Sequence, residues 1–105
     1  MNQEMSERLQ KISERLKREY NAERVILFGS YARGEETEDS DVDILVISPT
    51  KERMIERMTS VSKIIRDLRN GLPISPIVLT PEEFSQKIAI EDALIQTITE
   101  EGIIL

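Results

Sequence analysis

Three short apolar runs, each bounded by glycine, proline or polar residues, limit the folds open to this 105-residue chain. Their sequences are RVILFG, DVDILVIS and ISPIVLT. Continuous apolar runs of this length are typical of strands buried on both faces, so we expect strands at 24–28, 42–48 and 74–80. Because Pro76 lacks an amide donor, it indicates that the third strand lies at an edge of the sheet.

Helical segments surround these strands. Apolar residues recur every three or four positions in 3–20, 49–70 and 81–101, which predicts three amphipathic helices. The last of them opens on the sequence TPEE, which combines an N-cap residue, a proline at the first helical position and a glutamate three residues after the cap. We expect a break in this helix near Ile90 and its end at Gly102.

The lengths of the connections predict the sheet topology. The polar loop between the first two strands allows antiparallel pairing, while the long helix between the second and third suits a right-handed parallel crossover. The expected fold class is therefore α+β, a small mixed sheet flanked by helices in a single domain over 1–105. In this topology the Gly29-Ser30 pair shares one rim of the sheet with Asp41 and Asp43.

The composition excludes several classes of function. The chain has no cysteine and no histidine, which excludes disulfides, thiol nucleophiles, imidazole bases and ordinary zinc sites and leaves carboxylates, hydroxyls and a hard metal ion. A net charge of -6 argues against general nucleic-acid binding. No apolar run approaches the roughly 20 residues that span a bilayer, and the chain opens on charged residues, so we expect no membrane association and a cytoplasmic location.

Asp41 and Asp43 are the candidate metal ligands. Two residues apart on a strand, their side chains leave the same face, with α-carbons about 6.5 Å apart. Such carboxylates repel unless a cation lies between them, and Mg²⁺ typically takes one or two carboxylates together with water and phosphate oxygens. The alternative is an acidic turn that keeps the strand mouth soluble. A calcium loop starting at Asp39 fails, because Ile44 stands where that loop requires glycine.

Gly29, Ser30 and Arg33 are predicted to bind nucleotide phosphates. A helical turn that starts at Ser30 points backbone N–H groups and the hydroxyl at the rim, where they can bind phosphate oxygens. Arg33, one turn further, adds a charge-assisted contact. The alternatives are an ordinary turn glycine and a surface ion pair of Arg33 with Glu35 or Glu36. The stretch is not a P-loop, since the lysine and second glycine of that motif are missing.

The sequences GSYARG and SDVDILV together resemble the signature of the nucleotidyltransferase superfamily that includes DNA polymerase beta. Their spacing is similar to that of its minimal members, antitoxins paired with HEPN-domain toxins. The resemblance implies a polymerase beta palm-like fold and magnesium-dependent transfer of a nucleoside monophosphate, AMP from ATP, to a hydroxyl of a HEPN-type helical partner. It also implies that Gly29 and Ser30 hold the terminal phosphates and that Asp41 and Asp43 are catalytic and bind magnesium.

One part of the family pattern is replaced in this chain. The pattern calls for a third carboxylate at the start of the third strand, to help bind a second metal and activate the attacking hydroxyl. Ser75 aligns best with it, and a neutral hydroxyl neither offsets a second dication nor accepts a proton at neutral pH. Three outcomes stay open: Glu82, Glu83 or a partner completes the site, the protein works slowly with one metal, or it binds without catalysis.

Two functions therefore compete. The first is an enzyme that silences a HEPN-type toxin by adenylylating it. The alternative is a binding module, catalytically weak or inactive, that neutralises a partner by occlusion. A structural protein with an acidic rim is a third interpretation. The remaining apolar positions of the first and last helices leave open both a homodimer face and a partner face.

Overall fold

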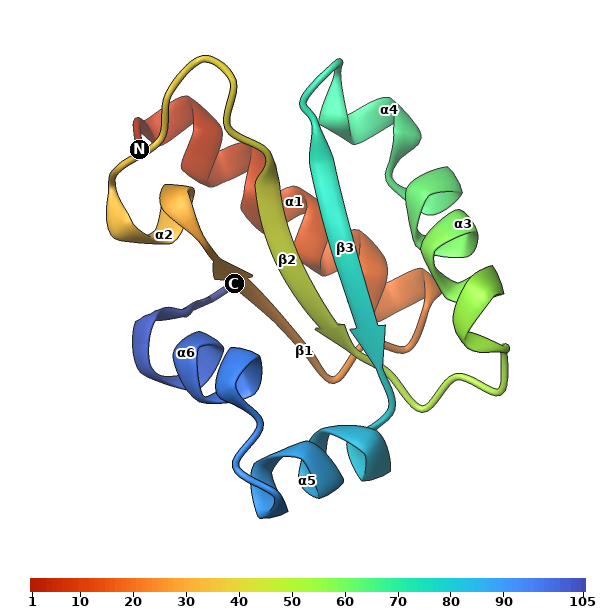
Figure 1. Ribbon diagram of the computed structural model, residues 1–105. Coiled ribbons are helices and arrows are strands. Elements are labelled where there is room, and N and C mark those ends of the chain that lie inside the picture. The colour runs from red at the N-terminus through yellow and green to blue at the C-terminus, as the bar shows by residue number, and fades with distance from the viewer.

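The computed structural model describes all residues from 1 to 105 and has an α+β fold built on a four-stranded mixed sheet (Figure 1). The strands are β1 (Arg24–Phe28), β2 (Val42–Ile47), β3 (Ile74–Leu79) and β4 (Ile103–Ile104). The helices are α1 (Gln3–Glu19), α2 (Ser30–Arg33), α3 (Met54–Ile64), α4 (Arg66–Arg69), α5 (Pro81–Ala89) and α6 (Ala93–Glu101). No helix combines the length and the apolarity needed to cross a lipid bilayer.

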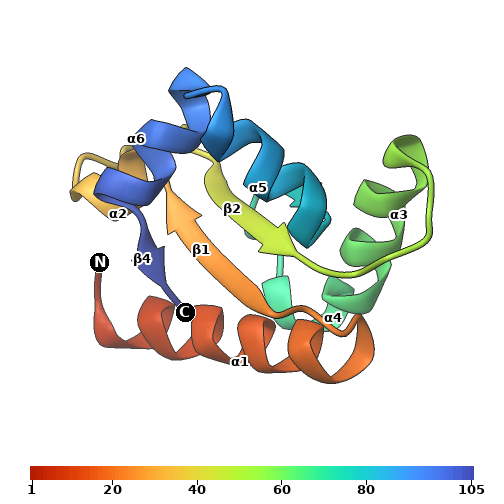
Figure 2. The same cartoon turned by 90° about the horizontal axis from the view of Figure 1, so that it is seen from below.

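Different helices cover the two faces of the sheet (Figure 2). On one face α1 packs against β2, with Leu9 and Val42 in the same buried cluster. On the opposite face α5 and α6 contribute to a second cluster, in which Phe84 packs with Leu45. Because successive strand residues alternate between faces, Asp43 projects on the same side as Leu45, toward the layer of α5 and α6.

The strand pairing confirms the predicted topology. β1 and β2 are antiparallel, with Phe28 opposite Asp43, and β2 and β3 are parallel, with Asp43 opposite Ser75. The sheet order β3-β2-β1-β4 places β3 at an edge, as Pro76 predicted. The end of β1 and the starts of β2 and β3 therefore meet at one rim of the sheet.

The helix predicted over 49–70 is wrong in its start and in its continuity. It begins only at Met54, where Arg53 is the N-cap and the Arg53 N–H donates to the Glu56 carboxylate. It then breaks at Ile65 into α3 and α4. The Arg15 guanidinium from α1 donates to the Ile64 carbonyl at 3.1 Å. The Leu68 N–H, which would donate to this carbonyl in a continuous α-helix, donates to the Ile65 carbonyl instead. At this break the Ile64 carbonyl therefore bonds to α1 and not to the next turn of its own helix.

The C-terminal segment confirms one prediction and adds a strand. The expected break near Ile90 separates α5 from α6, with Glu91 at a φ of +56° and the Asp92 side chain capping α6 by accepting the Ile95 N–H. After Gly102 the chain forms β4, an unpredicted strand antiparallel to β1. Two residues are too few to carry a periodic signal, so only pairing with β1 defines this strand.

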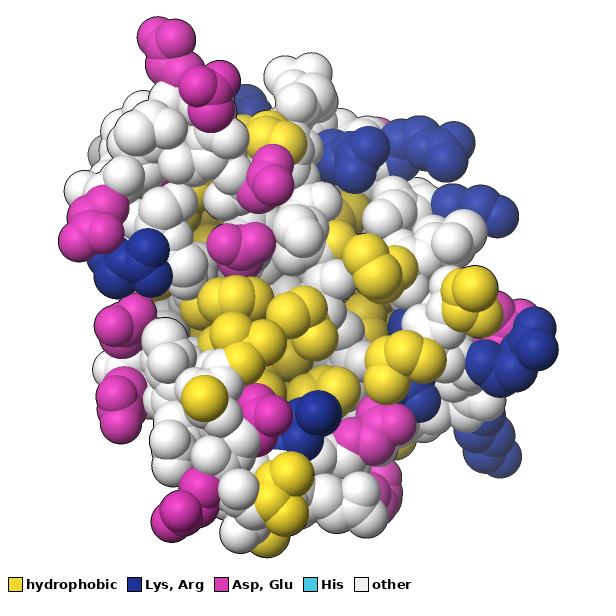
Figure 3. Space-filling view, in the orientation of Figure 1, with side chains coloured by type: hydrophobic (Ala, Val, Ile, Leu, Met, Phe, Trp, Pro, Cys, Tyr) yellow, Lys and Arg dark blue, Asp and Glu magenta, His cyan; other side chains and the backbone are white.

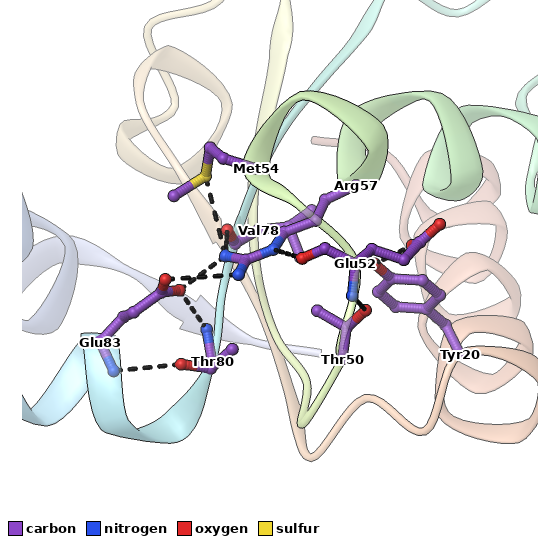
Figure 4. Close-up of polar contacts among 8 residues, drawn as sticks. All are labelled: Tyr20, Thr50, Glu52, Met54, Arg57, Val78, Thr80 and Glu83. Carbon is purple, nitrogen blue, oxygen red and sulfur yellow. Dashed lines mark hydrogen bonds and ion pairs between the residues drawn. The ribbon is translucent and has the colours of Figure 1, made fainter.

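Arg57 of α3 ties that helix to β3 and α5 (Figure 4). Its guanidinium is buried and donates to the backbone carbonyls of Glu52 at 3.1 Å and Val78 at 3.3 Å. Two further bonds reach the Glu83 carboxylate, at 2.6 Å from Nη1 to Oε1 and 3.3 Å from Nη2 to Oε2. Glu83 Oε1 also accepts the Thr80 N–H at 2.8 Å, so one carboxylate joins Arg57 to the start of α5.

Candidate functional site

The rim of the sheet brings the predicted phosphate-binding turn against the predicted metal ligands. Phe28 pairs with Asp43, so Gly29, the next residue, lies beside that carboxylate. Gly29 has a φ of +75°, and a Cβ added there would overlap Asp43 Oδ2. Glycine is therefore required at this position both by the left-handed backbone and by the close approach of the Asp43 side chain.

The two aspartates differ in their surroundings. Asp41 is exposed just before β2, whereas Asp43 is half-buried within it. Partial burial and, next, the charge of Asp41 raise the pKa of Asp43 above its ordinary value, while the charge of Arg33 acts in the opposite direction. A cation between these carboxylates would relieve both unfavourable effects. Two carboxylates are within the number that one magnesium ion takes from a protein, so the residues fit this ion.

The turn after β1 forms the short helix that was predicted to start at Ser30. Gly29 is the N-cap of α2, and its carbonyl accepts the N–H groups of Ala32 at 3.1 Å and Arg33 at 3.2 Å. Gly34 ends the helix in the left-handed conformation. Ser30, the first helical residue, is thereby held at the rim next to Gly29.

Arg33 lies near the rim but is committed to carboxylates. Its Nε donates to Glu35 at 3.1 Å, the surface pair that was the alternative to phosphate binding. Its Nη1 also donates to Glu101 of α6 at 3.4 Å, a partner that sequence periodicity did not indicate. Phosphate binding by Arg33 stays a prediction, and it requires these exposed pairs to open.

The structure excludes both glutamates named as replacements for the third carboxylate. Ser75 lies at the start of β3, as predicted, and the strand register places it opposite Asp43. Glu82 and Glu83 follow the other end of that strand, seven and eight residues after Ser75, and the strand from Ser75 to Leu79 alone spans about 13 Å. Glu83 is in addition bonded to Arg57. No group of three or more acidic side chains in the chain could hold a metal, so the rim offers only a carboxylate pair.

A depression that Asp41 and Ser75 help to line was not predicted. It has a volume of about 340 Å³ and lies between the start of β3 and the α3–α4 segment. Its lining residues are Asp41, Met58, Ser62, Arg69, Gly71, Leu72, Pro73, Ile74, Ser75 and Pro76. Figure 3 shows hydrophobic side chains gathered over the middle of this side of the molecule, acidic side chains above them, and lysine and arginine side chains along α3 and α4. The hollow forms where α3, the end of α4 and the start of β3 meet, a meeting that no local sequence pattern predicts.

Sequence comparison relates the chain to known proteins. A family model described as "Nucleotidyltransferase domain" matches residues 9–105. Three curated Methanocaldococcus jannaschii proteins, provisionally named protein adenylyltransferases, are also similar. One is 46% identical over 70 residues (60% of this chain, 45% of the relative), a second 41% over 66 (62% and 61%) and a third 54% over 43 (41% and 43%). The chain spans about half the length of these relatives.

Solved structures share the fold. A crystal structure of a Sulfolobus solfataricus protein, provisionally described as a nucleotidyltransferase, aligns with a TM-score of 0.56 at 31% identity, covering 76% of this chain and 70% of that one. A crystal structure of the toxin–antitoxin MntA-HpeT in a mutant form aligns with a TM-score of 0.56 at 23% identity, covering 92% and 70%. The second likeness shows the fold alone.

Proposed function

Since the chain belongs to the nucleotidyltransferase domain family, we propose that it is a magnesium-dependent enzyme that transfers AMP from ATP to a hydroxyl of a partner protein. The observation that carries this proposal is the strand register that sets Gly29 against Asp43, with Ser30 the next residue of the turn. Phosphoryl transfer depends mainly on positioning and charge neutralisation, so a turn that binds phosphates beside a carboxylate pair suits it. Histidine and cysteine are not required.

Each residue of the rim has a distinct role in this proposal. The Gly29-Ser30 turn binds the terminal phosphates through backbone N–H groups and the hydroxyl. Asp41 and Asp43 hold a magnesium ion, which supplies charge neutralisation for the phosphates. The acceptor hydroxyl oxygen bonds to the α-phosphorus, the bond from that phosphorus to the bridging oxygen breaks, pyrophosphate leaves, and the hydroxyl proton passes to water. Ser75 offers no carboxylate to accept this proton, so we expect a slow reaction.

The proposed acceptor is a protein, specifically a HEPN-type toxin. The names of the curated relatives point to transfer onto proteins, and one structural neighbour is a toxin–antitoxin. The acidic loop before β2 and the net charge of -6 disfavour a polynucleotide acceptor.

Isothermal titration with a non-hydrolysable ATP analogue, with and without magnesium, tests the nucleotide site. We expect magnesium-dependent binding that the Asp41→Asn, Asp43→Asn double variant loses. Incubation with α-labelled ATP and a HEPN-type partner then tests transfer. Label on the partner above the level of the double variant supports the enzyme, and the absence of both binding and label refutes it.

The serine at position 75 favours one second candidate. A binding module that neutralises its partner by occlusion needs neither a third carboxylate nor catalysis. It predicts that the double aspartate variant still protects cells against the partner, and loss of protection in that variant excludes it.

A further inference from the structure

We propose that Arg69 selects the acceptor, by pairing its guanidinium with a carboxylate that lies next to the acceptor hydroxyl on the partner protein. This inference rests on the proposed function and assigns its acceptor side to the depression between β3 and the α3–α4 segment. Arg69, Asp41 and Ser75 all line that depression, which has a volume of about 340 Å³.

The side of the sheet on which the acceptor arrives follows from the strand order. β2, which carries Asp43, has β1 on one side and β3 on the other. The predicted phosphate turn, Gly29-Ser30, ends β1, so the leaving pyrophosphate belongs to the β1 side. In phosphoryl transfer the attacking and leaving oxygens lie roughly in line on opposite sides of phosphorus. The acceptor hydroxyl therefore approaches from the β3 side, where the depression lies.

Arg69 is a free cation in this depression. It is half-buried, and its side chain forms no ion pair or hydrogen bond within the chain, whereas Arg15 and Arg57 are both paired with carboxylates. A guanidinium presents donors in a planar fork that matches a carboxylate. An acceptor segment with an aspartate or glutamate beside its hydroxyl would satisfy Arg69 and keep the acceptor in the depression.

The remaining surface favours a protein segment over a nucleic acid. Met58, Leu72 and two prolines supply the apolar part of a mixed lining, and methionine adapts readily to a partner's side chains. Exposed Met54 extends the apolar surface along α3, in an adjoining hollow that shares Met58 with the first. The lining has no aromatic side chain on which bases could stack, and a polynucleotide is repelled by the acidic loop before β2.

The acceptor does not bind by adding a strand to the sheet. At the free edge of β3, Pro76 has no N–H to donate, and the Val78 carbonyl already accepts a hydrogen bond from Arg57 at 3.3 Å. Strand addition needs both kinds of backbone group. Recognition therefore depends on side chains, which makes a folded or helical segment the suitable acceptor and Arg69 the residue that distinguishes one segment from another.

The test measures transfer of labelled AMP from ATP to synthetic helical peptides with one tyrosine or serine flanked by glutamates or by lysines, and to a 3′-hydroxyl oligonucleotide. For the wild-type chain we expect the KM for the glutamate-flanked peptides to be roughly tenfold lower than the KM for the lysine-flanked peptides. Arg69→Glu should abolish or reverse this preference while the Kd of the ATP analogue stays unchanged. Arg66→Glu is the matched control, because Arg66 lies on the same helix, is exposed and does not line the depression.

Three results would overturn the inference and leave the nucleotide site standing. The first is that no peptide is labelled although magnesium-dependent ATP binding persists. The second is that Arg69→Glu leaves the peptide preference intact, and the third is that the oligonucleotide is labelled in preference to the peptides. Weaker ATP binding in Arg69→Glu would also overturn it, because Arg69 would then belong to the nucleotide side. Loss of nucleotide binding in the wild type instead refutes the proposed function itself.

Discussion

Replacing Glu83 by glutamine removes the charge that compensates a buried cation. Arg57 is 7% exposed, and breaking a fully buried ion pair costs about 3–5 kcal/mol. The Glu83 side chain is 32% exposed, so water compensates part of this loss, and glutamine keeps an oxygen for the Thr80 N–H. We therefore expect Glu83→Gln to lower the free energy of unfolding by about 2 kcal/mol, equivalent to roughly 8–15 °C in Tm for a domain of this size.

Denaturant unfolding at neutral pH, with Tm as a second readout, measures this loss. Glu82→Gln is the control, because it removes the same charge from an exposed neighbour and should change stability by less than about 0.5 kcal/mol. A double-mutant cycle with Arg57→Met should give a coupling energy on the order of 1–2 kcal/mol, since the double variant no longer buries an unpaired charge.

The pH dependence provides an independent check. Hydrogen bonds from Arg57 are the main cause that lowers the pKa of Glu83 in the folded protein. The resulting stability is present above the unfolded pKa of about 4.3 and is lost as the pH falls through the lower folded pKa. The stability difference between wild type and Glu83→Gln should therefore shrink in acid. A difference below about 0.5 kcal/mol at neutral pH, or additive single changes in the cycle, would refute the reasoning.

Three other changes probe the rim itself. Gly29→Ala should lower stability by at least about 1–2 kcal/mol and abolish magnesium-dependent nucleotide binding by displacing Asp43, while Gly34→Ala, at a similar φ of +72° but in open space, should cost stability and leave binding intact. Ser75→Asp, which sets a third carboxylate opposite Asp43, should raise the rate of AMP transfer at least about tenfold relative to Ser75→Asn, and equal rates would contradict this. Asp43→Asn should raise Tm in the absence of metal at neutral pH, because the raised pKa of Asp43 in the folded protein means that its ionisation opposes folding. The gain should vanish in acid, where Asp43 is protonated in both the folded and the unfolded state. A gain in Tm that does not depend on pH would exclude this cause.

Local patterns carried much of the fold. The three apolar runs predicted β1, β2 and β3, and the polar loop and the long helical segment between them predicted antiparallel and parallel pairing. Pro76 predicted an edge strand, and the break near Ile90 was confirmed. Each of these features depends on residues close together in the chain, where strand or helix periodicity and proline chemistry act directly.

The rim of the candidate site was also predictable, for a related reason. Once the first two strands are antiparallel, the end of one must lie beside the start of the other, which brings Gly29 to Asp43. The same register sets Ser75 opposite Asp43. Glu82 and Glu83 were wrongly considered as substitutes, because closeness in sequence to β3 does not show at which end of the strand they lie.

By itself, the sequence determined the three longer strands, the directions of their pairing and the residues at the rim, because hydrophobic periodicity and connection lengths are local properties of the chain. Only the tertiary structure decided which polar groups from distant parts of the chain meet. The bond from Arg15 at the break of the second predicted helix, the burial of Arg57 against Glu83 and the hollow that Arg69 lines all join segments far apart in the sequence. Such contacts depend on how packed helices bring side chains together in three dimensions, and no short-range pattern encodes that geometry.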